Sequence, residues 1–179
     1  MVLSNKSLRF AERYREITRN PRYLLLKQVP RHGSTNTYDH SIRVAMMAYT
    51  LAPYFRVDAE SAAKVGLLHD FCFVDYHKKD PEVEKAYGGR WYCFYHPEDA
   101  VKNSEAEGYF LTLTEKKAIW SHMFPLSTSI PSSRLGCILT LSDKYVALEE
   151  SLANAGPGYH RVRGLVVLGY RRVRRFVGI

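Results

Sequence analysis

The chain has 179 residues, of which 46% are hydrophobic and 13% aromatic; this composition indicates a globular chain with one domain and a sizeable core, and it excludes a disordered or low-complexity protein. The net charge of +8 favours anionic partners, either phosphorylated small molecules or nucleic acid, without specifying a chemistry. Three scattered cysteines outside CxxC spacing exclude a disulfide framework and a zinc knuckle.

The N-terminal part of the chain is predicted to be helical. Its first residues are polar and mixed in charge, unlike a secretory signal, and no apolar run is long enough to span a membrane, so we expect a cytoplasmic protein without membrane contact. Residues 4–18 form an amphipathic pattern, and a short helix follows over residues 21–29. The core side of the first helix carries Leu8, Phe10, Ala11, Tyr14 and Ile17.

A central helix is predicted over residues 38–52, after a turn-forming linker at 30–37. This stretch is apolar on more than one face, so we expect it to be buried against several neighbours. His40 lies in its first turn, where a core histidine would be the ordinary interpretation if it stood alone.

The next helix is capped by Asp58 and ends at an adjacent histidine and aspartate, His69 and Asp70. Consecutive helical residues point about 100° apart, so these two side chains reach one metal only from the end of a helix or across a helix junction. The pair therefore indicates a metal site, whereas a bare His-Asp dipeptide also arises by chance.

Two further histidines follow a charged segment, residues 77–90, which resembles a loop-like insertion. Pro97 suits the first position of a helix, which would place His96 at the start of a helix that runs to about residue 108. Thr114 can cap a helix that carries His122 and ends before a proline.

A long apolar helix is predicted over residues 134–150, with Asp143 as its one acid before the end. A buried carboxylate is costly unless it is paired, so Asp143 needs a partner. A last basic helix is predicted over residues 160–179, where six arginines occur without an acid. It is interpreted as a solvated helix face or tail, with nucleic-acid or phosphate contact as the less favoured alternative.

Taken together, the chain supplies four imidazoles and two carboxylates in apolar helical surroundings. One helical domain with so many buried titratable groups is most easily explained if cations hold them. A mixed nitrogen and oxygen set suits a divalent transition metal (Fe, Mn, Co, Ni or Zn) better than calcium or magnesium. The candidate ligands are His40, His69, Asp70, His96, His122 and Asp143.

The order of these residues resembles the HD-domain superfamily of metal-dependent phosphohydrolases. The matching segments are TYDHSIRVA, VGLLHDF and LTLSDKY, and YHPEDAV and IWSHMFP are similar to the histidine segments of the branch that binds two metals, or one metal and phosphate. The resemblance implies an all-α fold, a single compact helical bundle of the HD-domain type over residues 1–179 with its core at about 36–150. It also implies that the six candidates bind one or two metal ions and that Asp70 bridges the ions of a dinuclear site.

The resemblance further implies hydrolysis of a phosphoester or phosphoanhydride of a nucleotide or another small phosphorylated metabolite, through metal-activated water. Positive side chains would help to bind phosphate, although each is also explained as a solvated surface cation. The candidates are Lys144 next to a ligand, and Lys78, Lys79 and Arg90 after the His-Asp pair. Asp75, rather than His77, is the candidate general acid for the leaving group.

Departures from the family narrow the substrate class. The cyclic-dinucleotide phosphodiesterase branch carries Gly-Tyr-Pro before its last aspartate, whereas here Gly158-Tyr159-His160 follows Asp143 and lacks the proline. We therefore do not expect the chain to belong to that branch. The branch that splits dinucleoside tetraphosphates is a looser analogue with a similar ligand order.

Two other functions and the oligomeric state remain open at this point. One alternative is a di-iron oxygenase of the same superfamily. The other is a non-catalytic nucleotide- or nucleic-acid-binding module that uses the basic C-terminus. The sequence does not decide whether the chain forms a homodimer.

Overall fold

The structure is a computed structural model that describes residues 3–31, 35–78 and 80–153. The C-terminal helix predicted over 160–179 and Lys79 lie outside the described residues. Within the described ranges the regular elements are helices without a β-strand, which confirms the all-α prediction. They are α1 (Asn5–Arg13), α2 (Arg15–Thr18), α3 (Pro21–Leu24), η1 (Leu25–Gln28), α4 (Thr37–Leu51), η2 (Ala52–Phe55), α5 (Ala59–Leu68), α6 (Pro81–Ala86), α7 (Tyr92–Ala106), α8 (Leu113–Ser121) and α9 (Arg134–Ala153).

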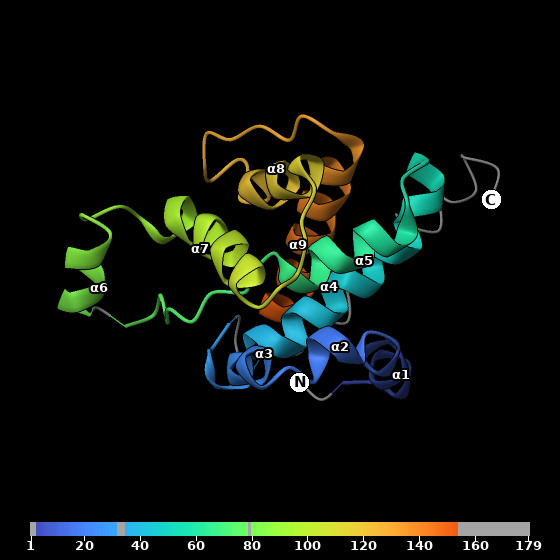
Figure 1. The fold of residues 1–179 in the computed structure, drawn as a ribbon, viewed down its shortest axis with the longest axis horizontal. Coiled ribbons are helices and arrows are strands. Elements are labelled where there is room, and N and C mark those ends of the chain that lie inside the picture. Colours follow the sequence, from blue (N-terminus) through green and yellow to red (C-terminus); the bar gives the residue numbers. More distant parts are fainter. Residues whose placement is uncertain (1–2, 32–34, 79, 154–179) are drawn as a thin grey trace.

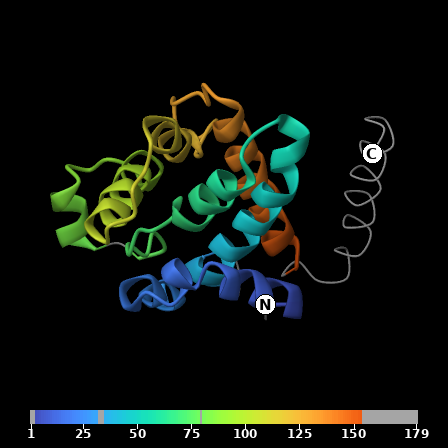
Figure 2. The ribbon, with the colours of Figure 1, turned by 45° about the vertical axis from the view of Figure 1, so that its right-hand side comes forward.

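Helices α4, α5 and α9 form the centre of the bundle, as Figures 1 and 2 show. Asn36 caps α4 by accepting the backbone N–H of Asp39 at 2.8 Å, and Asp58 caps α5 as predicted. The inward faces of α4 and α5 carry small and branched apolar side chains that are fully buried, including Ala45 and Val65. The prediction of a central helix at 38–52 is therefore correct in its position and in its burial.

The N-terminal helices cover one side of this centre. The helix predicted over 4–18 is broken at Tyr14, whose backbone (φ −104°, ψ 35°) leaves the helical region. Ala11 and Ile17 are buried as predicted, but Leu8 is 54% exposed, so its placement in the core is wrong. The buried Tyr23 donates its hydroxyl to the carbonyl of Leu67 at 2.7 Å, which ties α3 to α5.

The structure differs from the predictions at helices α6 and α7. The segment 77–90 contains a short helix, α6, which has no buried residue and projects from the bundle at the left of Figure 1. Helix α7 begins at Tyr92, so Pro97 lies inside it and His96 lies in its second turn. Pro97 cannot donate to the carbonyl four residues earlier, and the aromatic contacts of Tyr92 and Tyr95 help to hold this first turn.

Helix α8 begins after Thr112, not after Thr114 as predicted. Thr112 accepts the backbone N–H of Glu115, whose carboxylate accepts the backbone N–H of Thr112 at 2.8 Å, which is a capping box. A threonine followed three residues later by glutamate is the signal for this box, and Thr114 lacks it. The helix ends before Pro125, as predicted.

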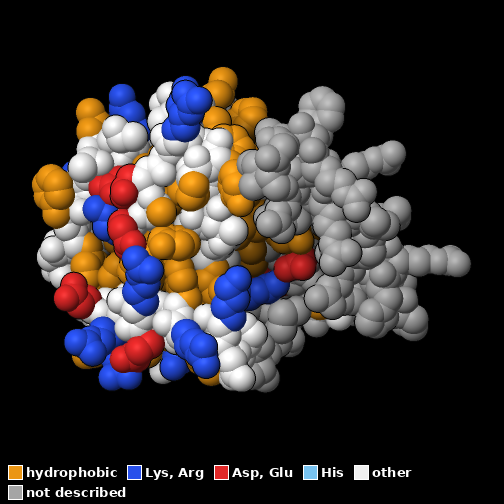
Figure 3. Space-filling view, turned by 90° about the vertical axis from the view of Figure 1, so that its right-hand side faces the viewer, with side chains coloured by type: hydrophobic (Ala, Val, Ile, Leu, Met, Phe, Trp, Pro, Cys, Tyr) orange, Lys and Arg blue, Asp and Glu red, His pale blue; other side chains and the backbone are white. Residues whose placement is uncertain are grey.

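The described surface mixes charges of both signs. No helix among the described residues is both long and apolar enough to cross a membrane. On the coloured part of the face in Figure 3, basic, acidic and apolar side chains are interspersed. Arg13 pairs with Glu60, and Arg19 pairs with Glu12 at 2.6 Å. The arginine-rich segment on which the nucleic-acid alternative depends is outside the described residues.

Candidate metal centre

All six predicted ligands converge at the centre of the bundle. His40 comes from the first turn of α4, His69 and Asp70 from the end of α5, and Asp143 from the middle of α9. His96 comes from α7, and His122 from the end of α8. Each of the six residues is at most 2% exposed. Five helices that are far apart in the sequence therefore bring their polar side chains to one buried point.

Helix ends explain how the adjacent pair His69 and Asp70 shares one centre. His69 is the C-cap of α5, so the chain leaves the helix at Asp70. The ring of His69 bonds through Nδ1 to the carbonyl of Gly66 at 2.8 Å. His122 repeats this arrangement at the end of α8, with Nδ1 at 2.6 Å from the carbonyl of Ile119.

The donor atoms form two groups that share Asp70. The first donor group consists of His40, His69, Asp70 and Asp143, and the second donor group consists of Asp70, His96 and His122; within each group the donor atoms lie within 4.8 Å of one another. Asp70 directs Oδ2 to the first group and Oδ1 to the second. One carboxylate thus faces two clusters of donors, one on each oxygen.

The spacing of these atoms is close to that of the ligands around one divalent metal ion. In the first donor group, Nε2 of His40 lies 3.1 Å from Oδ1 of Asp143, Nε2 of His69 lies 3.1 Å from Oδ2 of Asp70, and the two cross distances are 3.7 Å. In the second, the three distances are 3.1, 3.2 and 3.6 Å. Ligands at about 2.1 Å from a cation are about 3.0 Å apart at adjacent corners of an octahedron and about 3.4 Å apart in a tetrahedron.

The four imidazoles are held with the same nitrogen toward the centre. Nδ1 of His69, His96 and His122 bonds to a backbone carbonyl, at 2.6 to 2.8 Å, and Nδ1 of His40 bonds to the carboxylate of Glu150 at 2.8 Å. Because carbonyls and carboxylates only accept, Nδ1 of each ring carries a proton, and in the neutral ring the lone pair lies on Nε2. Metal-ligating histidines are held in this way in proteins generally.

Several of the inward atoms lack a hydrogen bond. Among the described residues, Nε2 of His69 and Oδ1 of Asp70 are buried without a hydrogen-bond partner. Oδ2 of Asp70 also makes no hydrogen bond of good geometry, although it pairs with the charge of Arg31. Nε2 of His96 faces Nε2 of His122 at 3.1 Å, although each ring already donates its proton from Nδ1. Buried acceptors that face one another are unfavourable unless a cation lies between them. The residues present therefore fit a divalent metal.

The charge states divide the centre into two halves. Burial opposes ionisation of Asp70 and Asp143. The imidazoles around both carboxyls, with Arg31 beside Asp70 and Lys144 beside Asp143, nevertheless keep the pKa of each carboxyl well below its usual value. Burial also disfavours a charged His69, yet Asp70 and Asp143 raise its pKa to about 9. Burial lowers the pKa of His96 and brings that of His122 to about 4, so both are neutral at neutral pH.

Arg31 is a site residue that the sequence did not reveal. It lies in the loop closed by the bridge between Pro30 and Asn36, it is 5% exposed, and its Nη2 lies 2.5 Å from Oδ2 of Asp70. Its Nη1 donates to the hydroxyl of Tyr92 at 3.3 Å, and its buried Nε has no partner. An arginine in a polar turn is ordinarily exposed, so only the folded loop shows its position.

Glu150 is a second site residue that the sequence did not reveal. It is fully buried near the end of α9, where it contacts His40 and Arg43. In the sequence it belongs to a charged helix end that is typical of a solvated surface. No pattern in that segment distinguishes it from its exposed neighbours.

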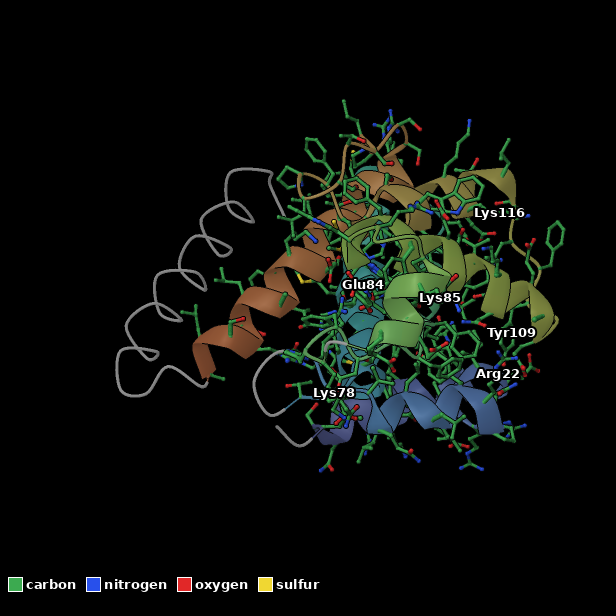
Figure 4. The ribbon with its side chains drawn as sticks, turned by 90° about the vertical axis from the view of Figure 1, so that its left-hand side faces the viewer. Arg22, Lys78, Glu84, Lys85, Tyr109 and Lys116 are labelled. Carbon is green, nitrogen blue, oxygen red and sulfur yellow. The ribbon has the colours of Figure 1, made fainter. Side chains whose placement is uncertain are left out.

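Of the cations predicted to bind phosphate, one lies at the metal centre and two of the others lie at the surface. Lys144 lies at the centre, with Nζ 2.7 Å from Oδ2 of Asp143. Arg90 instead pairs with Glu98 at 2.8 Å, and Lys78 is 79% exposed on the outer side seen in Figure 4. Lys79 is outside the described residues.

Asp75 lies in the turn that follows the His-Asp pair, where it accepts hydrogen bonds from His77. Its small degree of burial would raise its pKa, but His77 and Lys78 lower it below the usual value. The carboxylate is therefore ionised at neutral pH. Its role as general acid stays a prediction, and this charge state counts against it.

Comparison with known proteins agrees with this geometry. The model of one protein family, described as the HD domain, matches residues 37–148. The match runs from the start of α4 to α9 and includes all six residues of the two donor groups. No curated protein and no solved structure matches the chain.

Proposed function

Because the chain belongs to the HD-domain family, whose members are generally metal-dependent hydrolases, we propose that it hydrolyses a phosphoester or phosphoanhydride of a nucleotide or another small phosphorylated metabolite. The observation that carries this proposal is the pair of donor groups that share Asp70. Fold membership alone does not specify a reaction, so the proposal rests on the site.

The two donor groups would each hold a divalent transition metal. His40, His69, Asp70 and Asp143 supply four donors to the first ion, and His96 and His122 complete the second with the other oxygen of Asp70. When bound, such a cation acts as a Lewis acid that activates water at neutral pH and neutralises charge on phosphoryl oxygens.

Arg31 and Lys144 would orient the phosphoryl group. Arg31 is buried beside Asp70 and its Nε has no partner, and guanidinium groups bind phosphate through parallel hydrogen bonds. Lys144 adds positive charge on the opposite carboxylate, Asp143. Phosphoryl transfer depends mainly on such positioning and charge stabilisation. Tyr76 and Tyr92, which lie against Arg31, would form an aromatic side of the same region.

Replacing Arg31 with lysine should weaken catalysis without removing metal. Lysine keeps the charge but loses the planar pair of donors, and a hydrogen bond to a charged group contributes about 1.5–3 kcal/mol. We expect kcat/KM to fall about 10- to 100-fold while the metal content per chain stays that of the wild type. Arg90→Lys is the matched control, because Arg90 pairs with Glu98, and its kinetics should be unchanged. Equal losses in the two variants would remove Arg31 from this role.

The proposal is tested by purifying the protein without chelator, measuring its metals by elemental analysis, and screening nucleotides and phosphomonoesters with Mn, Co, Ni and Fe added back. We expect at least one ion per chain and metal-dependent phosphate release. Two irons with substrate-dependent oxygen uptake and no phosphate release would instead identify an oxygenase. Steeply salt-dependent DNA or RNA binding that survives metal removal, without turnover, would identify a binding module.

A further inference from the structure

The buried carboxylate of Glu150 lies directly behind His40. Its Oε2 accepts the Nδ1 proton of His40 at 2.8 Å, and its Oε1 accepts from Nη1 of Arg43 at 2.7 Å. Glu150 is fully buried, whereas Arg43 reaches solvent with 18% of its side chain exposed. A carboxylate withdrawn from water in this way is costly unless both its oxygens are paired.

Helix geometry explains how two acids hold one histidine. Asp143 and Glu150 are seven residues apart on α9, which is about two turns, so they lie on the same face. Asp143 approaches Nε2 of His40 at 3.1 Å while Glu150 approaches Nδ1. Two acids of one helix therefore lie next to the two nitrogens of this imidazole.

His40 differs from the other histidines of the centre in the charge of its partner. His69, His96 and His122 bond through Nδ1 to neutral backbone carbonyls. An anionic partner makes the far nitrogen of an imidazole a stronger donor to a metal than a carbonyl does, and it fixes the tautomer and the ring orientation. The arrangement thus places the strongest imidazole donor in the first donor group.

We propose that Glu150 is a positioning residue that orients His40 and strengthens its Nε2 as a ligand of the first donor group, with Arg43 neutralising the buried carboxylate. This inference rests on the proposed function, because it assigns Glu150 to the same metal centre. Glu150 is not one of the six donors, and it lies near the C-terminal end of α9.

The test is the affinity of the full chain for Mn²⁺ alone, measured by calorimetric titration for the wild type, Glu150→Gln and Glu149→Gln. Glutamine keeps the size of the side chain but has one acceptor oxygen, so it cannot serve both His40 and Arg43. Losing such a partner typically weakens metal binding about 10- to 100-fold, and we expect this loss for Glu150→Gln. Glu149 pairs with the same arginine at 2.8 Å, so Glu149→Gln alters the surroundings of Arg43 and leaves Glu150 in place; we expect its Mn²⁺ affinity to stay within twofold of that of the wild type.

Three outcomes separate this inference from the function on which it rests. Equal Mn²⁺ affinity in the wild type and Glu150→Gln, or equal losses in the two variants, would overturn the role of Glu150 alone. A wild-type chain that binds no Mn²⁺ would overturn the proposed function and this inference with it. Should Glu150→Gln not fold, ¹⁵N spectra of the Zn²⁺-loaded wild type decide: a proton on Nδ1 of His40 supports the role, and a proton on Nε2 refutes it.

Discussion

Replacing Asp70 with asparagine should remove metal from both donor groups and abolish hydrolysis. Asp70 is shared by the two groups and directs one oxygen to each. Asparagine has the same shape, but it carries no charge and presents an N–H donor in place of one oxygen, which a cation does not bind. The cations contribute several kcal/mol of transition-state stabilisation, so we expect activity to fall by at least about 10³-fold. Metal analysis and phosphate release measured on the same preparation check this result.

The matched control for this substitution is Asp80→Asn. Asp80 is exposed and caps α6, and asparagine caps a helix as well as aspartate does, so its metal content and activity should equal those of the wild type. Far-UV circular dichroism of Asp70→Asn should still show a helical protein, because the apolar core is unchanged. A folded Asp70→Asn variant that retains full metal content would refute the assignment of Asp70 to both groups.

The six donors could be recognised from the sequence because each is a polar residue in an apolar helical stretch. Burial of such a residue requires a partner, and six of them in one chain require a common one. His69 next to Asp70 and Asp143 within its apolar helix are the clearest cases, and the structure brings both to the same point. Their spacing along the chain also carried the family resemblance that the match to residues 37–148 confirms.

Arg31 and Glu150 could not be recognised in this way because their surroundings in the sequence are polar. Arg31 is buried because its side chain lies against Tyr92 and Asp70. Tyr92 is 61 residues away in the sequence, so no local pattern indicates this contact. Glu150 is buried because α9 lies against α4, where Arg43 and His40 meet it. Tertiary packing, rather than any local pattern, determines both positions.

Helix boundaries were missed for local reasons. Proline favours the first turn of a helix, but the aromatic residues before Pro97 extend α7 toward its N-terminus and leave the proline inside. Thr112 and Thr114 are both suitable caps, and only the glutamate three residues after Thr112 distinguishes them. Neither error displaced a donor residue from its helix.

Gly66 fixes the distance between the two helices that carry His40, His69 and Asp70. A Cβ at this position would lie 2.5 Å from Cα of Ala45 on α4, and 2.9 Å from its backbone nitrogen. Carbon atoms in contact are about 3.5–4.0 Å apart, so α4 and α5 would have to separate by about 1 Å. The carbonyl of Gly66 also holds the ring of His69, so the same residue sets the helix spacing and orients a donor.

Gly66→Ala should therefore lower both stability and activity, even though alanine favours a helix over glycine by about 1 kcal/mol. Overpacking against a backbone atom costs about 1–3 kcal/mol. After the gain in helix propensity is subtracted, we expect a net loss of up to about 2 kcal/mol in urea denaturation. A displacement of about 1 Å in a catalytic centre costs about 10²-fold in rate. Gly136→Ala on α9 is the matched control, because its Cβ would meet no atom closer than 3.4 Å and the helix should gain stability. If the two variants were equally stable, the close contact between Gly66 and Ala45 would not determine the distance between α4 and α5.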